Sequence, residues 1–182
     1  LKVKSKILKG DKSLFTLFTS GSTGLPKGVV HSSAGYFLYS KFTAKKQFGM
    51  SKNSIMLTAS DAGWLNGHTY ALFSPLAFGA TTILLEKPMT LINYFFLEKI
   101  LKKFNVSILY LPVTLIRLLR SIIPKNKKIY NHNIKALGSM GEPLAGSVAH
   151  WFSKLFFKKN KPIVNTYFQT ETGGIIASPR YN

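Results

Sequence analysis

The amino-acid sequence predicts an α/β fold, in which a mostly parallel sheet is flanked by helices. Short apolar and β-branched runs alternate along the chain with longer stretches of helical periodicity. Such alternation is typical of parallel sheets, because parallel neighbours need a long crossover connection. Polar, glycine-containing blocks directly follow several of the apolar runs. The chain has 182 residues, 46% of them hydrophobic, which is enough to bury one core.

The individual elements follow from the same patterns. A first strand over 14–19 alternates aromatic and aliphatic residues with threonine, as expected of a buried strand. A helix follows it, with Ser32 or Ser33 expected to cap its first turn. Pro112 favours the start of another helix. Further strands are predicted at 54–59, 81–85, 107–111, 134–138 and 162–166, further helices at 67–78, 91–104, 112–122 and from 143 to about 157, and a polar loop at 125–133.

Polar blocks lie directly after four of the predicted strands. In open parallel sheets, ligands bind beyond the carboxyl ends of the strands. This pattern permits four segments that are distant in sequence to converge on one crevice. They are 19–28, 61–68, 139–143 and 167–173.

The composition excludes several functional classes. No cysteine is present, so the chain has no disulfide framework, thiolate metal site or cysteine nucleophile. Residues 62–85 carry no charge, but Asn66, His68 and Pro75 make them too polar and broken for a membrane span. The basic residues 1–12 lack the apolar core of a signal peptide. We expect a cytoplasmic protein that does not bind a membrane.

The net charge of +19 at first suggests a nucleic-acid partner. However, the lysines are scattered in short runs, and arginine, the residue best suited to reading bases, is rare. A solvated, lysine-rich exterior explains the charge better, and it would also attract small polyanions. A basic nucleic-acid binder stays as an alternative, and it predicts affinity that falls steeply with salt.

The stretch 14–28, LFTLFTSGSTGLPKG, has the composition of a phosphate-binding loop. Its backbone N–H groups, its hydroxyls and the Lys27 ammonium can all point at a phosphate. The spacing fits neither the P-loop, which needs Gly-Lys-Ser/Thr at 26–28, nor the dinucleotide fingerprint G-x-G-x-x-G. A flexible surface turn is the alternative. The flanking apolar strand and the small number of charges argue against it.

At these residues the sequence resembles a known family. TSGSTGLPKG, at 19–28, looks like the signature loop of the adenylate-forming superfamily of AMP-dependent synthetases and ligases. Four later blocks, in the family's order, narrow the resemblance to the acetyl-CoA synthetases and their short-chain relatives. They are SDAGWLNGHTY (60–70), PLAFGATTILLE (75–86), GSMGEP (138–143) and NTYFQTETGG (165–174).

The resemblance implies a ligase that joins ATP and a short-chain acid into an acyl-adenylate and passes the acyl group to coenzyme A. Acetate is the first expectation, and propionate or another small acid is the alternative. ATP, Mg²⁺ and coenzyme A are the implied small molecules, with no nucleic-acid partner. The chain 1–182 would be part of the large AMP-binding domain. The ribose-binding aspartate, the hinge and the C-terminal domain with the catalytic lysine are expected downstream. The segment alone is therefore expected to be inactive, and a truncated, non-catalytic relative is a further alternative.

The resemblance also assigns residues to ATP and the metal. Glu171 would hold Mg²⁺ and Thr170 would reach the α-phosphate, which makes these two the implied catalytic residues. The alternatives are that Glu171 is an ordinary loop carboxylate with no metal and that Lys27 is an ordinary surface lysine. The family usually carries aspartate where this chain has Asn165. The ATP-binding set is Thr19, Ser20, Gly21, Ser22, Thr23, Gly24 and Lys27 at the phosphates, Gly141, Glu142 and Pro143 beside adenine, and Asn165, Thr166, Tyr167, Phe168, Gln169 and Thr170 along the nucleotide.

The implied acyl pocket departs from the acetate enzymes at all four wall positions. Those enzymes usually have valine, threonine, valine and tryptophan where this chain has Leu65, Asn66, Met140 and Phe168. A phenylalanine in place of tryptophan enlarges the pocket, whereas leucine and methionine in place of valine narrow it. The sequence therefore does not give the net volume of the pocket. In such a pocket, a difference of one methylene group changes the discrimination between two substrates by about 1–3 kcal/mol, so substitutions of this size can redirect substrate choice. Trp64 either gates this pocket or belongs to the core.

Overall fold

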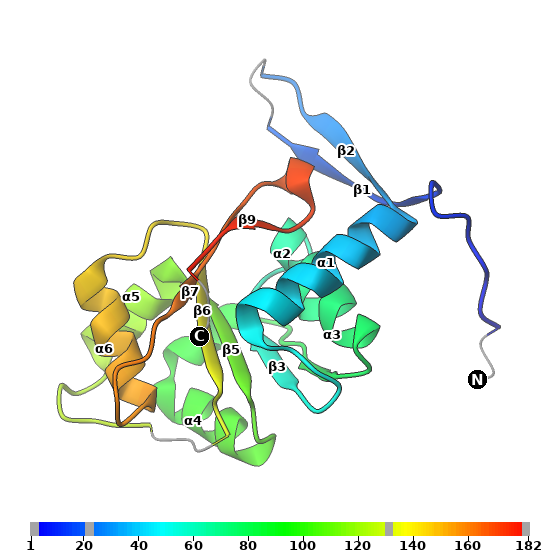
Figure 1. The fold of residues 1–182 in the computed structure, drawn as a ribbon. Helices are drawn as coiled ribbons and strands as arrows, with labels where there is room; N and C mark the ends of the chain where they lie inside the picture. Colours follow the sequence, from blue (N-terminus) through cyan, green and yellow to red (C-terminus); the bar gives the residue numbers. More distant parts are fainter. Residues whose placement is uncertain (1–3, 21–23, 130–132, 180–182) are drawn as a thin grey trace.

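A sheet of five parallel strands lies at the centre of the computed structural model, which describes residues 4–20, 24–129 and 133–179 (Figure 1). The strands are β3 (Ile55–Thr58), β4 (Thr81–Ile83), β5 (Ile108–Pro112), β6 (Ala136–Met140) and β7 (Val164–Asn165). Their order across the sheet is β4-β3-β5-β6-β7. Leu57 pairs with Leu109, and Leu109 with Leu137, in parallel register. The predicted α/β class is confirmed.

Helices cover both faces of the sheet, so its central strands β3, β5 and β6 are mostly buried on both sides. Leu57, Leu109 and Leu137 pack into one hydrophobic core, whereas Met56 and Ile108 pack into a second. This alternation is the two-residue period of a strand. The first core holds α4 (Tyr94–Lys103), α5 (Val113–Ile122) and α6 (Gly146–Phe156), and the second holds α1 (Ser33–Phe48), on the opposite side of the sheet (Figure 1).

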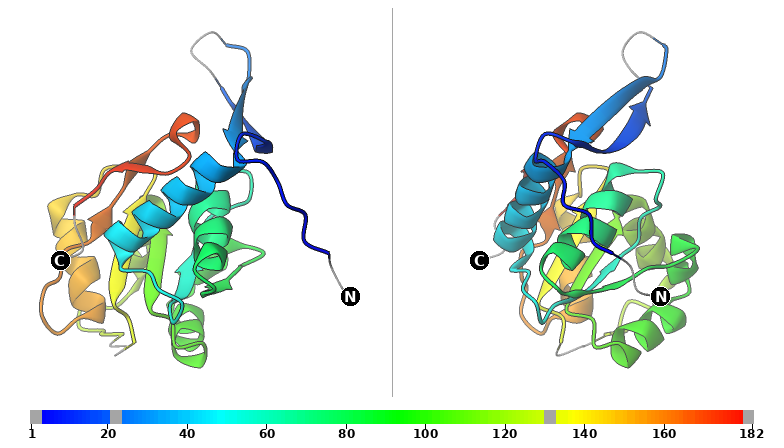
Figure 2. Two further views of the ribbon diagram at one scale, coloured as in Figure 1. Left: turned by 45° about the vertical axis from the view of Figure 1, so that its right-hand side comes forward. Right: turned by 90° about the vertical axis from the view of Figure 1, so that its right-hand side faces the viewer.

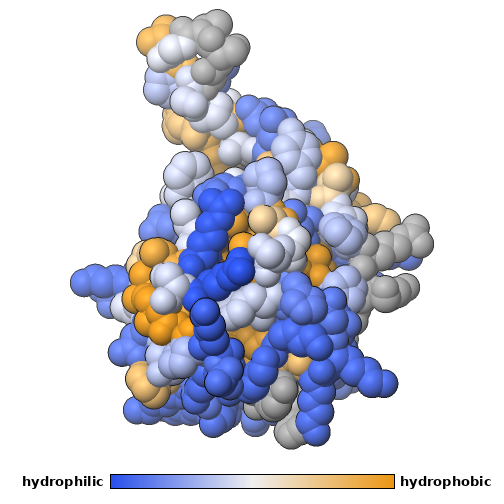
Figure 3. Space-filling model, turned by 90° about the vertical axis from the view of Figure 1, so that its left-hand side faces the viewer, coloured by the Kyte–Doolittle hydropathy of each residue, from blue (hydrophilic) through white to orange (hydrophobic). Residues whose placement is uncertain are grey.

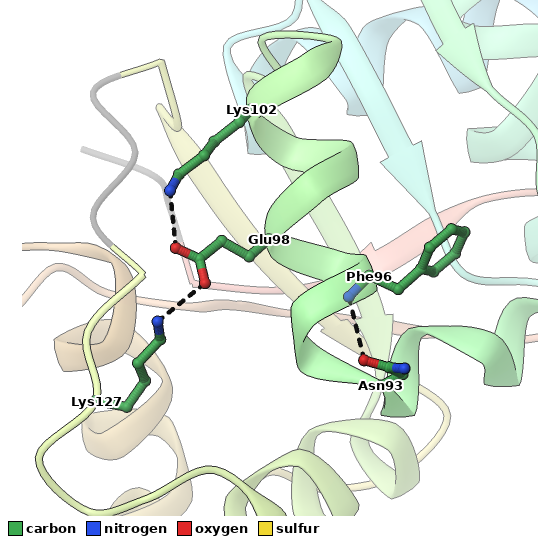
Figure 4. Close-up of polar contacts among 5 residues, drawn as sticks. All are labelled: Asn93, Phe96, Glu98, Lys102 and Lys127. Atoms are coloured by element: carbon green, nitrogen blue, oxygen red, sulfur yellow. Dashed lines mark hydrogen bonds and ion pairs between the residues drawn. The ribbon is translucent and has the colours of Figure 1, made fainter.

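The predicted helix 91–104 is divided into two parts. A 3₁₀ segment, η2 (Pro88–Ile92), precedes α4. Asn93 lies between them, and its Oδ1 accepts a hydrogen bond of 3.2 Å from the backbone N–H of Phe96 (Figure 4). A short polar side chain at this position satisfies one of the free donors at a helix start.

Glu98 joins α4 to the loop that follows α5. Its carboxylate oxygens lie 2.9 Å from Lys102 Nζ and 3.0 Å from Lys127 Nζ (Figure 4). The hydrogen bond from Lys102 is the main cause that holds the pKa of Glu98 below its ordinary value; partial burial opposes it, and Lys127 adds to the lowering. The pair with Lys127 crosses between two elements, so it contributes to tertiary structure as well as to the helix.

The start of α1 differs from the prediction. Ser32 is the N-cap residue, but its side chain makes no cap hydrogen bond. The hydroxyl of Ser33 donates instead to the carbonyls of Lys9 and Gly10, at 3.0 and 3.3 Å. The predicted serine cap is therefore wrong: Ser33 fixes the residues before the first strand against the helix. Pro112, by contrast, is the N-cap residue of α5, as its fixed φ favours.

The stretch 65–77 is helical, as predicted over 67–78, but it changes pitch. It runs through α2 (Leu65–His68), a π-helical segment η1 (Thr69–Phe73) and α3 (Ser74–Ala77). Pro75 has no N–H to offer the carbonyl of Ala71, four residues earlier. That carbonyl accepts a hydrogen bond of 2.6 Å from the hydroxyl of Thr82, on β4. Thr82, on the sheet, thus supplies the hydrogen-bond donor that Pro75 cannot.

The first strand is not part of the central sheet. It is β1 (Ser13–Thr19), and it pairs antiparallel with β2 (Lys27–Ser32) in a separate two-stranded hairpin. This hairpin projects away from the body in every view of the ribbon (Figures 1 and 2). Phe18 is 72% exposed. The expected strand is present, but the expectation that it is buried is wrong, because it pairs with β2 outside the central sheet. The loop also leads into β2 before the helix begins.

The chain ends in a second small antiparallel pair that the sequence did not predict. Its strands are β8 (Tyr167–Phe168) and β9 (Ile175–Ala177), separated by the 3₁₀ turn η3 (Thr170–Thr172). This segment runs between the body and the base of the hairpin (Figures 1 and 2). The predicted last strand, 162–166, is shorter in the structure, where β7 covers only two residues.

Hydrophilic residues cover much of the face shown in Figure 3, with smaller hydrophobic areas among them. This distribution agrees with lysines scattered over a solvated exterior. Among the described residues, no helix combines the length and the apolar character needed to cross a membrane.

Candidate functional site

Three of the four predicted polar blocks meet beyond the carboxyl ends of the sheet strands. Asn66 Nδ2 donates to Met140 Sδ, which joins the block after β3 to the block after β6. Thr69 Oγ1 donates to the carbonyl of Gly173 at 2.9 Å, which joins the helical stretch after β3 to the turn after β8. These contacts place the segment after β3 against both 139–143 and the turn that ends at Gly173.

The described residues of the fourth block, 19, 20 and 24–28, lie at the outer end of the projecting hairpin. Thr19 and Lys27 face each other in the last register pair of β1 and β2, and Lys27 is exposed. Gly24 has a φ of 80°, which glycine adopts without strain. Gly21, Ser22 and Thr23 lie outside the described residues. The base of the hairpin, rather than the described part of its tip, contacts the other blocks.

His31 makes that contact. Its Nε2 lies 2.8 Å from the carbonyl oxygen of Thr170, and because a carbonyl only accepts, His31 donates. The His31 ring is 8% exposed and lies 5.0 Å from the ring of Phe15. Phe15 also stacks on His68, at 4.8 Å between ring centroids. His68, whose role the sequence left open, is therefore part of an aromatic stack at the hairpin base.

The turn that carries Thr170 and Glu171 is held by its own side chains and by the hairpin. The Thr172 hydroxyl donates to the carbonyls of Gln169 and Gly174, at 2.8 and 3.0 Å. Gly173 follows with a φ of 72°, and a Cβ there would lie 3.2 Å from the His31 ring. The tight turn and the close histidine together require glycine at this position.

The Glu171 carboxylate is exposed and takes part in no ion pair among the described residues. The same part of the chain contains no cluster of three or more Asp, Glu or His side chains that would hold a metal ion without help. Mg²⁺ is commonly bound by one or two carboxylates together with substrate phosphates and water. A single free carboxylate fits a metal that arrives with a nucleotide, and does not fit a resident metal.

The residues expected beside adenine lie at the end of β6. Gly141 has a φ of 87°, and nothing lies within 4 Å of the position of a Cβ there. Glu142 turns its carboxylate to Arg117 on α5, with Nη1 2.8 Å from Oε2. Both side chains are well exposed, so this pair adds little stability. It does leave the backbone of Gly141, Glu142 and Pro143 as the surface that a flat base could approach.

The nucleotide-side segment after β7 is fixed to β6. Asn165 Oδ1 accepts a hydrogen bond of 3.0 Å from Ser139 Oγ. Thr166 is buried, and its hydroxyl donates to the carbonyl of Ser139 while it also bonds to the hydroxyl of Tyr110. The Thr166 hydroxyl is therefore already engaged in hydrogen bonds to two other residues of the protein. Tyr167 and Gln169 are exposed on either side of the half-buried Phe168.

Of the five residues expected at the acyl pocket, Asn66 contacts Met140, and three are almost fully buried. Leu65 and Asn66 are each 3% exposed, and Met140 is 4% exposed. Phe168 packs against the core cluster that contains Met140. Trp64 differs: it is 71% exposed, so a place for it in the core is excluded. The exposed Trp64 thus directly precedes the buried Leu65 in the chain.

Three buried tyrosines hold the site's framework. Burial raises the pKa of Tyr36, Tyr70 and Tyr110 well above the ordinary value, so all three stay neutral. The Tyr36 hydroxyl bonds to Thr69 at 2.8 Å, and the Tyr70 hydroxyl accepts from the backbone N–H of Ile175 at 2.8 Å. These phenols are hydrogen-bonding groups of the structure rather than acid–base catalysts.

Sequence reasoning missed His31, Tyr36 and Tyr70 as parts of this framework. Their partners lie 139, 33 and 105 residues away in the chain. No local pattern marks such contacts. The only available signal for His31 was its place directly after the glycine-rich loop.

Comparison with known proteins agrees with this geometry. Residues 2–182 match the family model described as AMP-binding enzyme. The chain belongs to this family. It is 39% identical over 179 residues to the acetyl-coenzyme A synthetase of Helicobacter pylori strain G27, and 41% identical over 169 residues to acetyl-coenzyme A synthetase 1 of Saccharomyces cerevisiae. These alignments cover 98% and 91% of this chain.

A solved structure supports the fold of this AMP-binding chain independently. The crystal structure of an acyl-CoA synthetase from Brucella canis aligns with 93% of the chain at a TM-score of 0.77 and 28% sequence identity. The chain covers 30% of that structure, and 27% and 23% of the two synthetases above. It therefore spans about a quarter of the length of the relatives it matches.

Proposed function

We propose that the protein containing this AMP-binding chain activates a short carboxylic acid with ATP. The acid, acetate in the first instance, becomes an acyl-adenylate with release of pyrophosphate. Coenzyme A then takes the acyl group and AMP is released. The observation that carries the proposal is the convergence of three segments at one sheet edge, where the free carboxylate of Glu171 and the buried residues Asn66 and Met140 lie in joined blocks. The similarity to acetyl-coenzyme A synthetases over nearly the whole chain supports it.

The chemistry poses a charge problem, because a carboxylate must attack a polyanionic triphosphate. Mg²⁺, when bound with ATP, neutralises phosphate charge, and Glu171 is the residue proposed to hold it. Thr170 would donate to the α-phosphate. The hydroxyls and backbone of 19–24, with Lys27, would bind the outer phosphates. These groups orient the nucleotide so that attack is in line.

The rest of the site would hold the two organic parts of the substrates. The backbone of 141–143 is proposed to lie against adenine, and 165–169 along the nucleotide. Leu65, Asn66, Met140 and Phe168 are proposed to line the acyl pocket, with Trp64 at its edge. Because all four wall residues differ from those usual in acetate enzymes, propionate or another small acid is the second candidate substrate.

ATP–pyrophosphate exchange with the full-length protein tests the proposal. Acetate, propionate and butyrate would be compared at saturating ATP and Mg²⁺, and acid-dependent exchange is expected with at least one of them. The chain 1–182 alone is expected to show none, since the relatives it matches are about four times longer. A full-length protein that exchanges pyrophosphate with no short acid would contradict the proposal.

A further inference from the structure

The amide of Asn66 is left half-satisfied in the core. The residue is 3% exposed, and its Nδ2 donates to Met140 Sδ. Its Oδ1 has no hydrogen-bond partner among the residues that the structure describes. Buried polar atoms are almost always paired in folded proteins, and an unpaired one is costly and calls for an explanation.

The orientation of this amide follows from its neighbour. A thioether sulfur is a weak acceptor and cannot donate, so the –NH₂ group is the end that faces Met140. The carbonyl oxygen is thereby turned away from Met140, and it is buried without a partner among the described residues. Leu65, Met140 and Phe168, the other proposed wall residues, carry apolar side chains. Asn66 thus adds a hydrogen-bond acceptor to a wall that is otherwise apolar.

We propose that the acyl pocket selects a short acid that carries a hydroxyl group on its carbon chain. This inference rests on the proposed function, and it names the substrate class of that same site. The substrate hydroxyl would donate to Asn66 Oδ1 and so satisfy the atom that the fold leaves unpaired. A neutral hydroxyl suits the wall better than an ammonium group, because none of the four wall residues is charged and a buried charge needs a partner.

Glycolate and propionate make the sharpest comparison. They have the same number of non-hydrogen atoms, and glycolate has a hydroxyl where propionate has a methyl group. Differences in pocket volume therefore affect the two acids nearly equally, and the ratio of their kcat/KM values reports the hydrogen bond. A site with an unpaired buried acceptor rejects an analogue that lacks the donor. We expect the full-length enzyme to prefer glycolate by about tenfold.

Substitution of Asn66 provides the second half of the test. Asn66→Leu keeps the approximate size and removes the carbonyl, and it should lower the glycolate-to-propionate ratio by about tenfold. Asn66→Thr keeps a side-chain oxygen, so it should retain part of the preference for glycolate. It replaces the leucine variant in the test if that variant does not fold. Leu65→Val is the matched control: it changes the volume of the wall without touching the amide, so the ratio should stay in favour of glycolate.

Each outcome decides the proposal. A wild-type enzyme that exchanges pyrophosphate with propionate at least as well as with glycolate would overturn it while leaving the proposed function intact. A ratio that is unchanged in Asn66→Leu would also overturn it. Exchange with none of the acids would refute the proposed function itself, and the inference with it. A glycolate preference that is lost in Asn66→Leu and kept in Leu65→Val would support it.

Discussion

His31 and Thr170 are 139 residues apart in the chain, and the His31 Nε2–H donates to the Thr170 carbonyl at 2.8 Å. This hydrogen bond joins the base of the β1–β2 hairpin to the turn that carries Glu171. The hairpin bears the glycine-rich loop, and the turn bears the proposed metal ligand. Two segments proposed to hold one nucleotide are therefore fixed to each other by this hydrogen bond and the aromatic stack around His31.

The first prediction concerns His31. His31→Leu removes the donor and leaves the Thr170 carbonyl unpaired, so we expect kcat/KM for ATP in pyrophosphate exchange to fall by about tenfold or more. His31→Gln can still present an N–H, and it should recover a large part of the loss. If both variants lose the same activity, His31 acts only as a packing residue, and the positioning role is wrong.

The second prediction concerns the metal. In the full-length protein, Glu171→Gln keeps the shape of the side chain but removes the charge, so the Mg²⁺ concentration for half-maximal exchange should rise by about tenfold or more. Glu86→Gln is the matched control, since Glu86 is also exposed and lies outside the proposed ATP site. A Mg²⁺ dependence that is identical in wild type and Glu171→Gln would contradict the assignment.

The third prediction concerns Gly138 in the middle of β6. A Cβ at this position would lie 2.6 Å from the Tyr110 ring and 2.7 Å from the Phe48 ring. Both rings are fully buried and packed, so Gly138→Ala should lower the free energy of unfolding by about 1–3 kcal/mol through overpacking. Gly146→Ala serves as the control, because nothing lies within 4 Å of its Cβ position. Urea denaturation that gives equal midpoints for the two variants would contradict the packing at Gly138.

The fourth prediction concerns pH. The pKa of Glu98 is lowered in the folded state, so its contribution to stability is complete above the unfolded value of about 4.5 and is lost as pH falls through the lower folded value. Glu98→Gln should therefore destabilise the protein at pH 7 by about 1 kcal/mol, and the difference should vanish in strong acid. Thermal unfolding at several pH values checks this. A difference that grows towards low pH would have the wrong sign.

Local patterns were sufficient for most of the central sheet. The apolar run predicted as a strand at 107–111 is β5, and the helix predicted at 112–122 is α5, both within one residue. Strand and helix periods are properties of neighbouring residues, so the sequence displays them directly. The same patterns permitted the blocks beginning at 61, 139 and 167 to meet, since the carboxyl ends of parallel strands share one edge, and the family resemblance favoured that meeting.

Nonlocal pairing explains where the prediction was wrong. The run at 14–19 has the alternation of a buried strand, yet it pairs with 27–32 outside the sheet and leaves Phe18 exposed. Alternation specifies two faces of a strand, but it does not specify what covers them. Which face is covered depends on the rest of the molecule.

The sequence by itself determined the fold class, the family and the set of candidate site residues, because these depend on local periods and short motifs. Only the tertiary structure decided that His31 bonds to Thr170, that Trp64 lies exposed, and that the Asn66 carbonyl is buried with no donor in the described part of the chain. Each of these is a relation between residues far apart in the chain. Burial and hydrogen bonding arise only when such residues are brought together, so no stretch of sequence read alone contains them.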